Sequence, residues 1–166
     1  MKLNFGKSHL LIVVYLIAIV AANLSVAYWG ATASIYNALI LVALDLTARD
    51  GLHELWHKKN LWLKMLALIG TGSFISFLLN YDALLIAVAS FSAFALAGLS
   101  DTVVYALLGD KSKLVKMNGS NVVSGTVDTT AFVIIAGLPL WVIPAQILAK
   151  IFGGAFWSVL INKFIK

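Results

Sequence analysis

The chain has 166 residues, of which 61% are hydrophobic and only 11% are charged, and its mean hydropathy is +0.97. A soluble globular domain is about half apolar and about one quarter charged, so this composition excludes a soluble domain and indicates a membrane protein. The chain contains no cysteine, which excludes disulfides and cysteine-bound metals, and its net charge of +5 comes from short basic clusters between apolar runs rather than from a nucleic-acid-binding patch.

Apolar stretches of roughly 20 residues are long enough to cross a hydrocarbon core of ~30 Å as helices. The predicted spans are residues 9–28, 31–49, 61–80, 83–108, 120–138 and 140–162. The first is too long for the apolar core of a signal peptide and lacks a clear small-residue cleavage site, so we expect it to be retained as a span. The fold class predicted is therefore an all-α integral membrane protein, with residues 1–166 forming a single domain of six transmembrane helices.

Basic residues fall on one side of these spans. Of the 12 lysines and arginines, all but Lys150 precede the first span, lie in or beside the second and fourth connections, or follow the last span. The aromatic residues expected at the membrane interfaces are Trp29, Trp62, Tyr81 and Trp141. By the positive-inside rule both termini are cytoplasmic, which predicts a multi-pass protein of the cytoplasmic (inner) membrane.

Two charged residues lie deep within the predicted spans. Lys150 is about ten residues into the sixth span, and Asp128 is about eight residues into the fifth, entering from the opposite side. At ~1.5 Å per residue, both reach the neighbourhood of the bilayer midplane. A charge there costs about 2.5–3.5 kcal/mol on insertion scales, so we expect the two residues to pair.

Further polar residues share the helix faces of this pair. Asn121 and Ser124 precede Asp128 at helical spacing, and Gln146 precedes Lys150 by four residues. These groups fit either interhelical braces or a ligand cavity, and we favour the cavity. Their mixture of donors and acceptors suits a planar, polar heteroaromatic solute.

Other candidates are more dispersed. Trp157 continues the stripe of the sixth span, and either Trp157 or a tyrosine such as Tyr105 is predicted to stack on the face of such a solute. Asn23 lies in the outer half of the first span and Asp101 in the cytoplasmic third of the fourth. Asp45, near the inner end of the second span, precedes Arg49 by one helical turn, and this pair fits a structural ion pair or a gate equally well.

The segment His-Glu-Leu-Trp-His at residues 53–57 matches H-E-x-x-H, the pattern of zinc metalloproteases. Such a site needs a third protein ligand, and the only other histidine is His9. A structural interpretation requires less, because Glu54 precedes Lys58 by four residues and His57 adjoins a basic interface turn. We therefore interpret the match as accidental and expect no metal, no cofactor and no enzymatic activity, with an intramembrane zinc metallohydrolase as a remaining alternative.

Several segments, taken in order, resemble the queuosine-precursor transporters, also called the VUT or vitamin uptake family. They are Ala-Asn-Leu at 22–24, Leu-Asp-Leu-Thr-Ala-Arg-Asp at 44–50, Ser-Asp-Thr-Val-Val-Tyr at 100–105 and Asn-Gly-Ser-Asn-Val-Val-Ser-Gly-Thr-Val-Asp-Thr at 118–129. Gln146 and Lys150 resemble the Gln-x-x-x-Lys of that family's last span. The segment Arg-Asp-Gly-Leu-His-Glu replaces a longer acidic pattern of larger members, which leaves the exact substrate open.

This resemblance implies a bundle like the substrate-binding S components of energy-coupling-factor vitamin transporters. It implies import of a 7-deazapurine such as 7-cyano-7-deazaguanine, the precursor of queuosine. Asp128 and Asn121 would read the guanine-like edge, Gln146 and Lys150 would add donors, and Asp101 and Asp45 would act in gating or proton coupling. The expected partners are this small molecule and the lipid bilayer, without nucleic acid. Homo-oligomerisation, the energy source and an ATPase partner, which a vitamin-binding S-like component would need, are left open.

Overall fold

The structure is a computed structural model that describes residues 3–45, 48, 52, 60–108, 111 and 113–165; for residues 3–7, 61–62, 101–102, 105–106, 113–118, 120–121, 158 and 161–165 it describes the backbone alone. Every regular element in this part of the chain is a helix, as predicted. In chain order these are α1 (Leu3–Asn37), the π-helix η1 (Ala38–Val42), α3 (Leu61–Leu79), the 3₁₀-helix η2 (Tyr81–Ala83), α4 (Leu84–Leu107), α5 (Lys113–Ile135) and α6 (Val142–Ile165).

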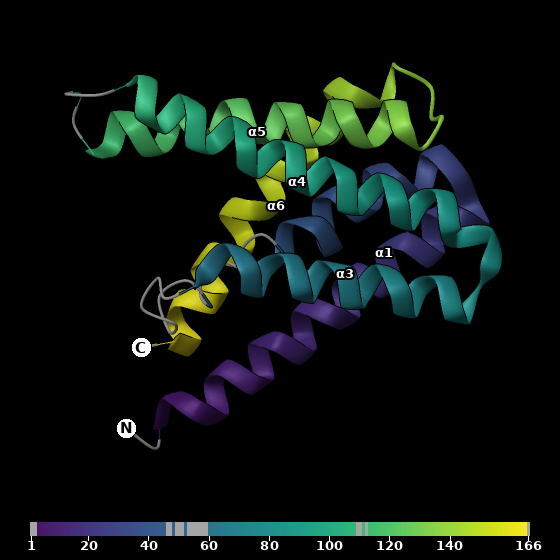
Figure 1. Ribbon diagram of the computed structural model, residues 1–166, viewed down its shortest axis with the longest axis horizontal. Helices are drawn as coiled ribbons and strands as arrows, with labels where there is room; N and C mark the ends of the chain where they lie inside the picture. The colour runs from purple at the N-terminus through teal and green to yellow at the C-terminus, as the bar shows by residue number, and fades with distance from the viewer. Residues whose placement is uncertain are drawn as a thin grey trace.

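The helices pack as a bundle in which α4 and α5 run side by side, α3 lies against α1 and α4, and α6 packs on η1 and α1 (Figure 1). Two helical stretches are long and apolar enough to cross a membrane by length and composition, Ser8–Asp45 and Tyr81–Ser100. Shorter apolar helical stretches are Leu63–Leu79, Val122–Ile135 and Val142–Trp157. The 19 residues of α3 correspond to a rise of about 28 Å, close to the thickness of a hydrocarbon core.

A single residue, Gly30, reverses the chain within α1. Its backbone has φ 65° and ψ −144°, while the residues on both sides are helical. The reversal is evident from Asn37, whose side-chain amide donates to the carbonyl oxygen of Ala22 over 3.1 Å. In a straight helix, residues 15 positions apart would be about 22 Å apart. A break between the predicted spans 9–28 and 31–49 is therefore present, but it takes one residue rather than a loop.

Replacing Gly30 with alanine is expected to destabilise the protein by about 1–3 kcal/mol, because L residues rarely adopt this backbone conformation. A methyl group at this position meets no atom within 4 Å, so the cost comes from the backbone alone. Thermal unfolding of the purified protein in detergent measures the effect. Gly154→Ala is the matched control, since its methyl group also meets nothing within 4 Å but lies in regular helix. Equal melting temperatures for the two variants would contradict the strain at Gly30.

The other two reversals at this end of the bundle also lie where the sequence predicts them. Gly137 has φ 67° and ends α5 in a Schellman motif, in which Leu138 N–H donates to Val133 O over 2.9 Å and Gly137 N–H to Ile134 O over 3.1 Å. Between α3 and α4, the side chain of Asn80 accepts a hydrogen bond from the backbone N–H of Asp82 over 3.0 Å. Both turns are thus fixed by local hydrogen bonds.

The helices differ from the predicted spans in their bounds and in one local feature. Helix α5 begins at Lys113, seven residues before the predicted span at 120, because hydropathy marks where a membrane would begin and not where a helix begins. The second predicted span contains the π-helix η1, which the periodicity of its apolar residues does not reveal.

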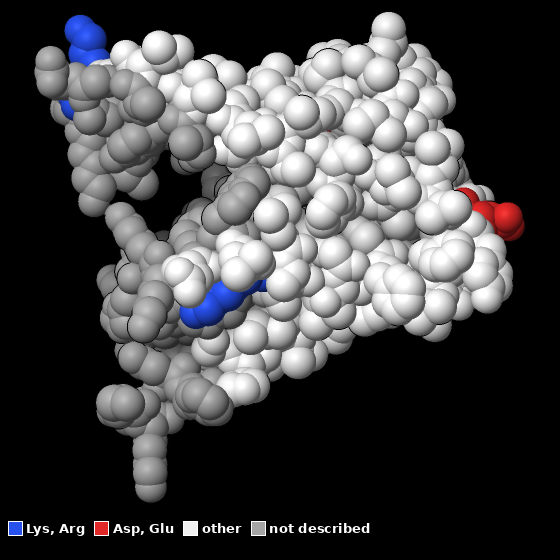
Figure 2. All heavy atoms as spheres, viewed as in Figure 1, with Lys and Arg blue, Asp and Glu red and all other residues white. Residues whose placement is uncertain are grey.

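The two ends of the bundle differ in their turns and in their charge. The reversal within α1, the η2 turn and the α5–α6 connection lie at one end, while the start of α1, the end of α4 and the end of α6 lie at the other (Figure 1). On the face drawn in Figure 2, lysine atoms lie toward the second end and acidic atoms lie at the first, with uncharged surface between them. Tyr28, Trp29, Tyr81 and Trp141, near the first end, are all more than half exposed.

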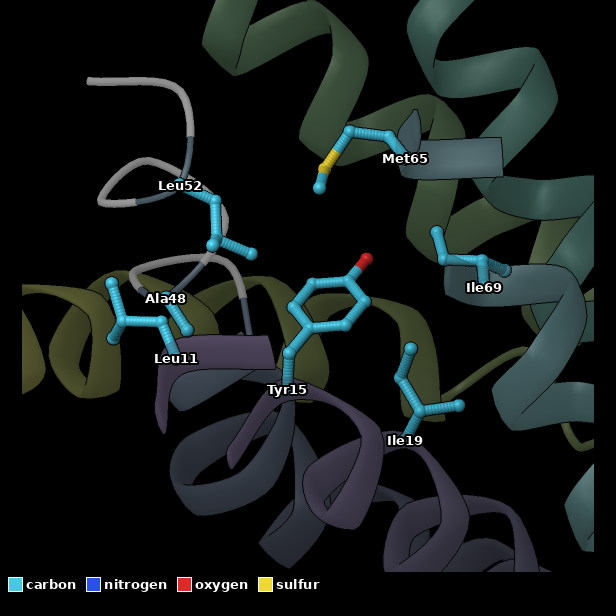
Figure 3. Packing of buried hydrophobic residues seen from close by; sticks show 7 residues of the cluster. All are labelled: Leu11, Tyr15, Ile19, Ala48, Leu52, Met65 and Ile69. Atoms are coloured by element: carbon cyan, nitrogen blue, oxygen red, sulfur yellow. The ribbon is translucent and has the colours of Figure 1, made fainter. Parts of the chain in front are cut away.

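Apolar clusters fill both halves of the bundle. One surrounds the ring of Tyr15 and contains Leu11, Ile19, Ala48, Leu52, Met65 and Ile69 (Figure 3). The other, nearer the turns, contains Val26, Ile86, Ala89 and Ala136, with Phe132 packed against it. Members of each cluster also line the cavity described next, which therefore lies between them.

Candidate functional site

A cavity of about 280 Å³ lies inside the bundle, with walls from α1, η1, α3, α4, α5 and α6. Its polar lining residues are Asn23, Ser34, Asn37, Asp45, Ser90, Ser124, Asp128, Gln146 and Lys150. Most of the remaining wall is aliphatic, and the phenylalanines Phe94 and Phe132 contribute aromatic surface. This combination of an apolar wall with a few convergent polar groups is typical of a small-molecule site, and the volume is near the lower end of the usual range of about 300–1,000 Å³.

The charged residues Asp128 and Lys150 form the predicted ion pair across the α5–α6 interface. Lys150 Nζ is 2.6 Å from Asp128 Oδ2 and donates a second hydrogen bond, of 2.8 Å, to Thr129 Oγ1. The side chains of Lys150 and Asp128 are 11% and 23% exposed, and both line the cavity. The pair therefore presents charge to a largely apolar cavity, in which electrostatic interactions are screened less than in bulk water.

Amide and hydroxyl groups extend the polar wall from α6 to the helix that follows Gly30. Gln146, which is 2% exposed, donates from Nε2 to Ser34 Oγ over 2.9 Å. Asn37 donates to Ala22 O over 3.1 Å and to Ser25 Oγ over 2.6 Å. We call Gln146, Ser34 and Asn37 the amide wall. Because Gln146 and Lys150 are four residues apart on α6, the amide wall and the ion pair adjoin each other.

Asn23, which also lines the cavity, connects three helices. It donates to Ser76 Oγ of α3 over 3.2 Å and accepts from Ser90 Oγ of α4 over 2.6 Å. Ser76 in turn donates to the carbonyl of Gly72 over 2.8 Å. A buried amide bonded on both sides fixes the relative positions of α1, α3 and α4 around the cavity.

The predicted site residues divide into those that line the cavity, those outside the described part of the chain, and Trp157. Six line the cavity, namely Asn23, Asp45, Ser124, Asp128, Gln146 and Lys150. For Asn121, Asp101 and Tyr105 the side chains, and for Arg49 the whole residue, lie outside the described part of the chain, so the expected contacts of Asn121 and the Asp45–Arg49 pair lie there too. The segment 53–57 also lies outside the described residues.

Trp157 differs from the prediction, because it is not among the residues that line this cavity. Its ring packs edge-on against Phe156, with a centroid separation of 5.4 Å and an interplanar angle of 74°. On α6 it lies seven residues beyond Lys150, which corresponds to about 10.5 Å along the helix axis. Phe94 and Phe132 provide the aromatic wall instead.

Sequence reasoning missed several lining residues, of which Ser34, Asn37 and Ser90 are polar. A signal for two of them was present, since Ser34, Asn37, Leu41 and Asp45 recur at spacings of three and four along the second predicted span. Small hydroxyl residues such as Ser90 carry no comparable signal, because serine is common in helix-packing faces of membrane proteins.

Apolar helices that surround a polar, partly charged cavity are typical of membrane proteins that bind small solutes. A family model described as "Putative vitamin uptake transporter" matches residues 8–165, nearly the whole chain. The chain belongs to this transporter family. Neither a curated protein nor a solved structure gives a match.

Proposed function

We propose that this protein imports a queuosine precursor, 7-cyano-7-deazaguanine or a related 7-deazapurine, across the cytoplasmic membrane. The observation that carries the proposal is the cavity itself, in which an ion pair and two amides adjoin at the centre of an apolar bundle. Polar groups buried among apolar helices are costly unless they are needed for structure or for a ligand. A bound ligand with hydrogen-bonding edges accounts for the polar groups that line the cavity.

The lining suits a flat bicyclic ring with polar edges. Phe94 and Phe132 supply apolar faces against which such a ring can stack, while Asp128, Lys150 and Gln146 supply charged and amide groups for its edge. A ligand of this size has few atoms, so the small cavity of about 280 Å³ is sufficient. The size and chemistry of the cavity thus support a deazapurine over a larger cofactor.

Six transmembrane helices with both termini in the cytoplasm are part of this proposal. The lysines Lys64 and Lys111 are exposed, and the lysine atoms visible in Figure 2 lie toward the end of the bundle away from the acidic atoms. This asymmetry supports an orientation with that end in the cytoplasm. Apolar clusters on both sides of the cavity would then separate in turn, one for entry and the other for release.

The function is tested by rescue of tRNA modification. Cells that cannot make the precursor and lack their own importer are supplied with 7-cyano-7-deazaguanine in the medium, with or without this chain. Expression is expected to restore queuosine in tRNA, measured by mass spectrometry, at external concentrations that leave the parent strain unmodified. Restoration that requires a co-expressed energy-coupling ATPase would assign the chain to the S-component type. No rescue by a chain that is present in the membrane would refute the proposed substrate.

A further inference from the structure

The hydrogen bonds of Gln146 determine which of its amide atoms faces its neighbour. Ser34 donates its hydroxyl proton to the carbonyl of Ala31 over 2.6 Å, so its oxygen can only accept from Gln146. Nε2 of Gln146 is therefore the atom 2.9 Å from Ser34 Oγ, and the carbonyl oxygen Oε1 points elsewhere. The orientation of the Gln146 amide therefore follows from the single proton of the Ser34 hydroxyl, which is already donated to Ala31.

Asn37 is fixed in the same way. Its amide nitrogen donates to the carbonyl of Ala22 and to Ser25 Oγ, so both of its N–H groups are used. Ser25 donates its own proton to the same Ala22 carbonyl over 3.0 Å and can therefore only accept from Asn37. What Asn37 has left is its carbonyl oxygen Oδ1. In the part of the chain that the structure describes, no donor reaches Asn37 Oδ1 or Gln146 Oε1.

Ser34 and Asn37 are three residues apart on one helix face, so the amide of Asn37 and the amide bonded to Ser34 are neighbours in the cavity wall. We propose that the oxygens of Asn37 and Gln146 form an acceptor edge that selects ligands carrying two neighbouring N–H donors. This inference rests on the proposed function and specifies how that site reads its substrate. It assigns Gln146 an acceptor role, in contrast to the donor role that the family resemblance implies.

Lys150 completes the pattern one helical turn from Gln146. Its ammonium group has three N–H donors, of which Asp128 and Thr129 take two among the described residues. The remaining N–H donor of Lys150 complements a ring carbonyl. The two amide oxygens beside it complement a ring N–H and an amino group on the same edge. An isostere that lacks one of these donors leaves a buried amide oxygen unpaired, which is the costly outcome in a low-dielectric site.

Ser34 and Ser25 act as positioning residues in this arrangement, because their hydroxyl oxygens accept hydrogen bonds from the amides of Gln146 and Asn37. Removing the Ser34 hydroxyl leaves Gln146 in place but frees its amide to rotate and present N–H groups to the cavity. Selectivity should then decrease more than overall affinity. That separation distinguishes positioning from a general loss of structure.

The test measures binding of three probes to the purified full chain in lipid nanodiscs by isothermal titration calorimetry. The probes are 7-cyano-7-deazaguanine, its 2-desamino analogue and its N1-methyl analogue. Wild-type protein is expected to bind the parent compound at least about tenfold more tightly than either analogue, because each analogue lacks one donor. Gln146→Met and Asn37→Leu should each lose at least one of these preferences, and Ser34→Ala should reduce the preference while keeping measurable affinity for the parent compound.

Thr71→Val is the matched control, since Thr71 also donates its hydroxyl to a preceding backbone carbonyl, that of Ala67 over 2.8 Å, but is exposed and is not among the residues that line the cavity. It should keep the wild-type preferences. Equal binding of all three probes by the wild type would overturn the acceptor edge while leaving the proposed function intact. Failure of the wild type to bind any of them would overturn both. Unchanged preferences in Gln146→Met and Asn37→Leu would also overturn the acceptor edge.

Discussion

Replacing Lys150 with methionine is expected to reduce uptake of the 7-deazapurine at least about a hundredfold, and Asp128→Asn should have an effect of similar size. Each change leaves the other charge without its partner at 2.6 Å. Leaving one member of a buried pair uncompensated costs about 3–5 kcal/mol, and each variant also loses a group proposed to contact the ligand. Initial uptake rates in whole cells, corrected for the amount of protein in the membrane, measure the effect.

The double variant Asp128→Asn/Lys150→Met separates a structural brace from a ligand site. It removes both charges, so no uncompensated charge remains and the protein should accumulate in the membrane at least as well as the single variants. If the pair only joins α5 to α6, uptake should recover in the double variant. If the pair binds the ligand, as we propose, uptake should stay absent. The control for loss of a lysine is Lys64→Met, which changes an exposed residue of α3.

Depth in the membrane is the reason that the Asp128–Lys150 pair was predictable. Hydropathy places both residues near the centre of apolar spans, and the cost of an isolated charge there leaves pairing as the expected arrangement. The positions of the turns were predictable for a related reason, because glycine, proline, asparagine and charged residues interrupt the apolar runs at 28–30, 80–82 and 137–139.

The amide wall was less accessible to sequence reasoning because it depends on tertiary packing. The bond from Gln146 to Ser34 joins residues 112 positions apart, and it requires α6 to lie on the helix that follows Gly30. Nothing in the periodicity of either segment specifies that contact. The phenylalanines pose the same difficulty, since Phe94 and Phe132 line the cavity whereas Phe74 and Phe152 are exposed on the bundle surface. All four occur in apolar runs of similar composition.

Replacing Gly153 with alanine is expected to destabilise the bundle by about 3 kcal/mol or more and to reduce uptake strongly, because this glycine lies where α6 crosses the π-helix η1. An added methyl group would overlap the backbone carbonyl oxygen of Leu39 and lie 2.6 Å from the Cβ atom of Ala43. A backbone carbonyl cannot move aside as a flexible side chain can, so α6 itself must shift. Because Gln146 and Lys150 lie one to two turns away on α6, a shift would also disturb their bonds to Ser34 and Asp128.

The adjacent residue supplies the control for this prediction. A methyl group on Gly154 meets no atom within 4 Å, so Gly154→Ala should keep wild-type uptake and unfold at the same or a higher temperature, since alanine favours helix over glycine by up to about 1 kcal/mol. Thermal unfolding in detergent and uptake in cells are measured for both variants. A Gly153→Ala protein as stable and active as Gly154→Ala would mean that α6 does not approach η1 this closely. The cavity wall formed by Gln146 and Ser34 would then lack its structural basis.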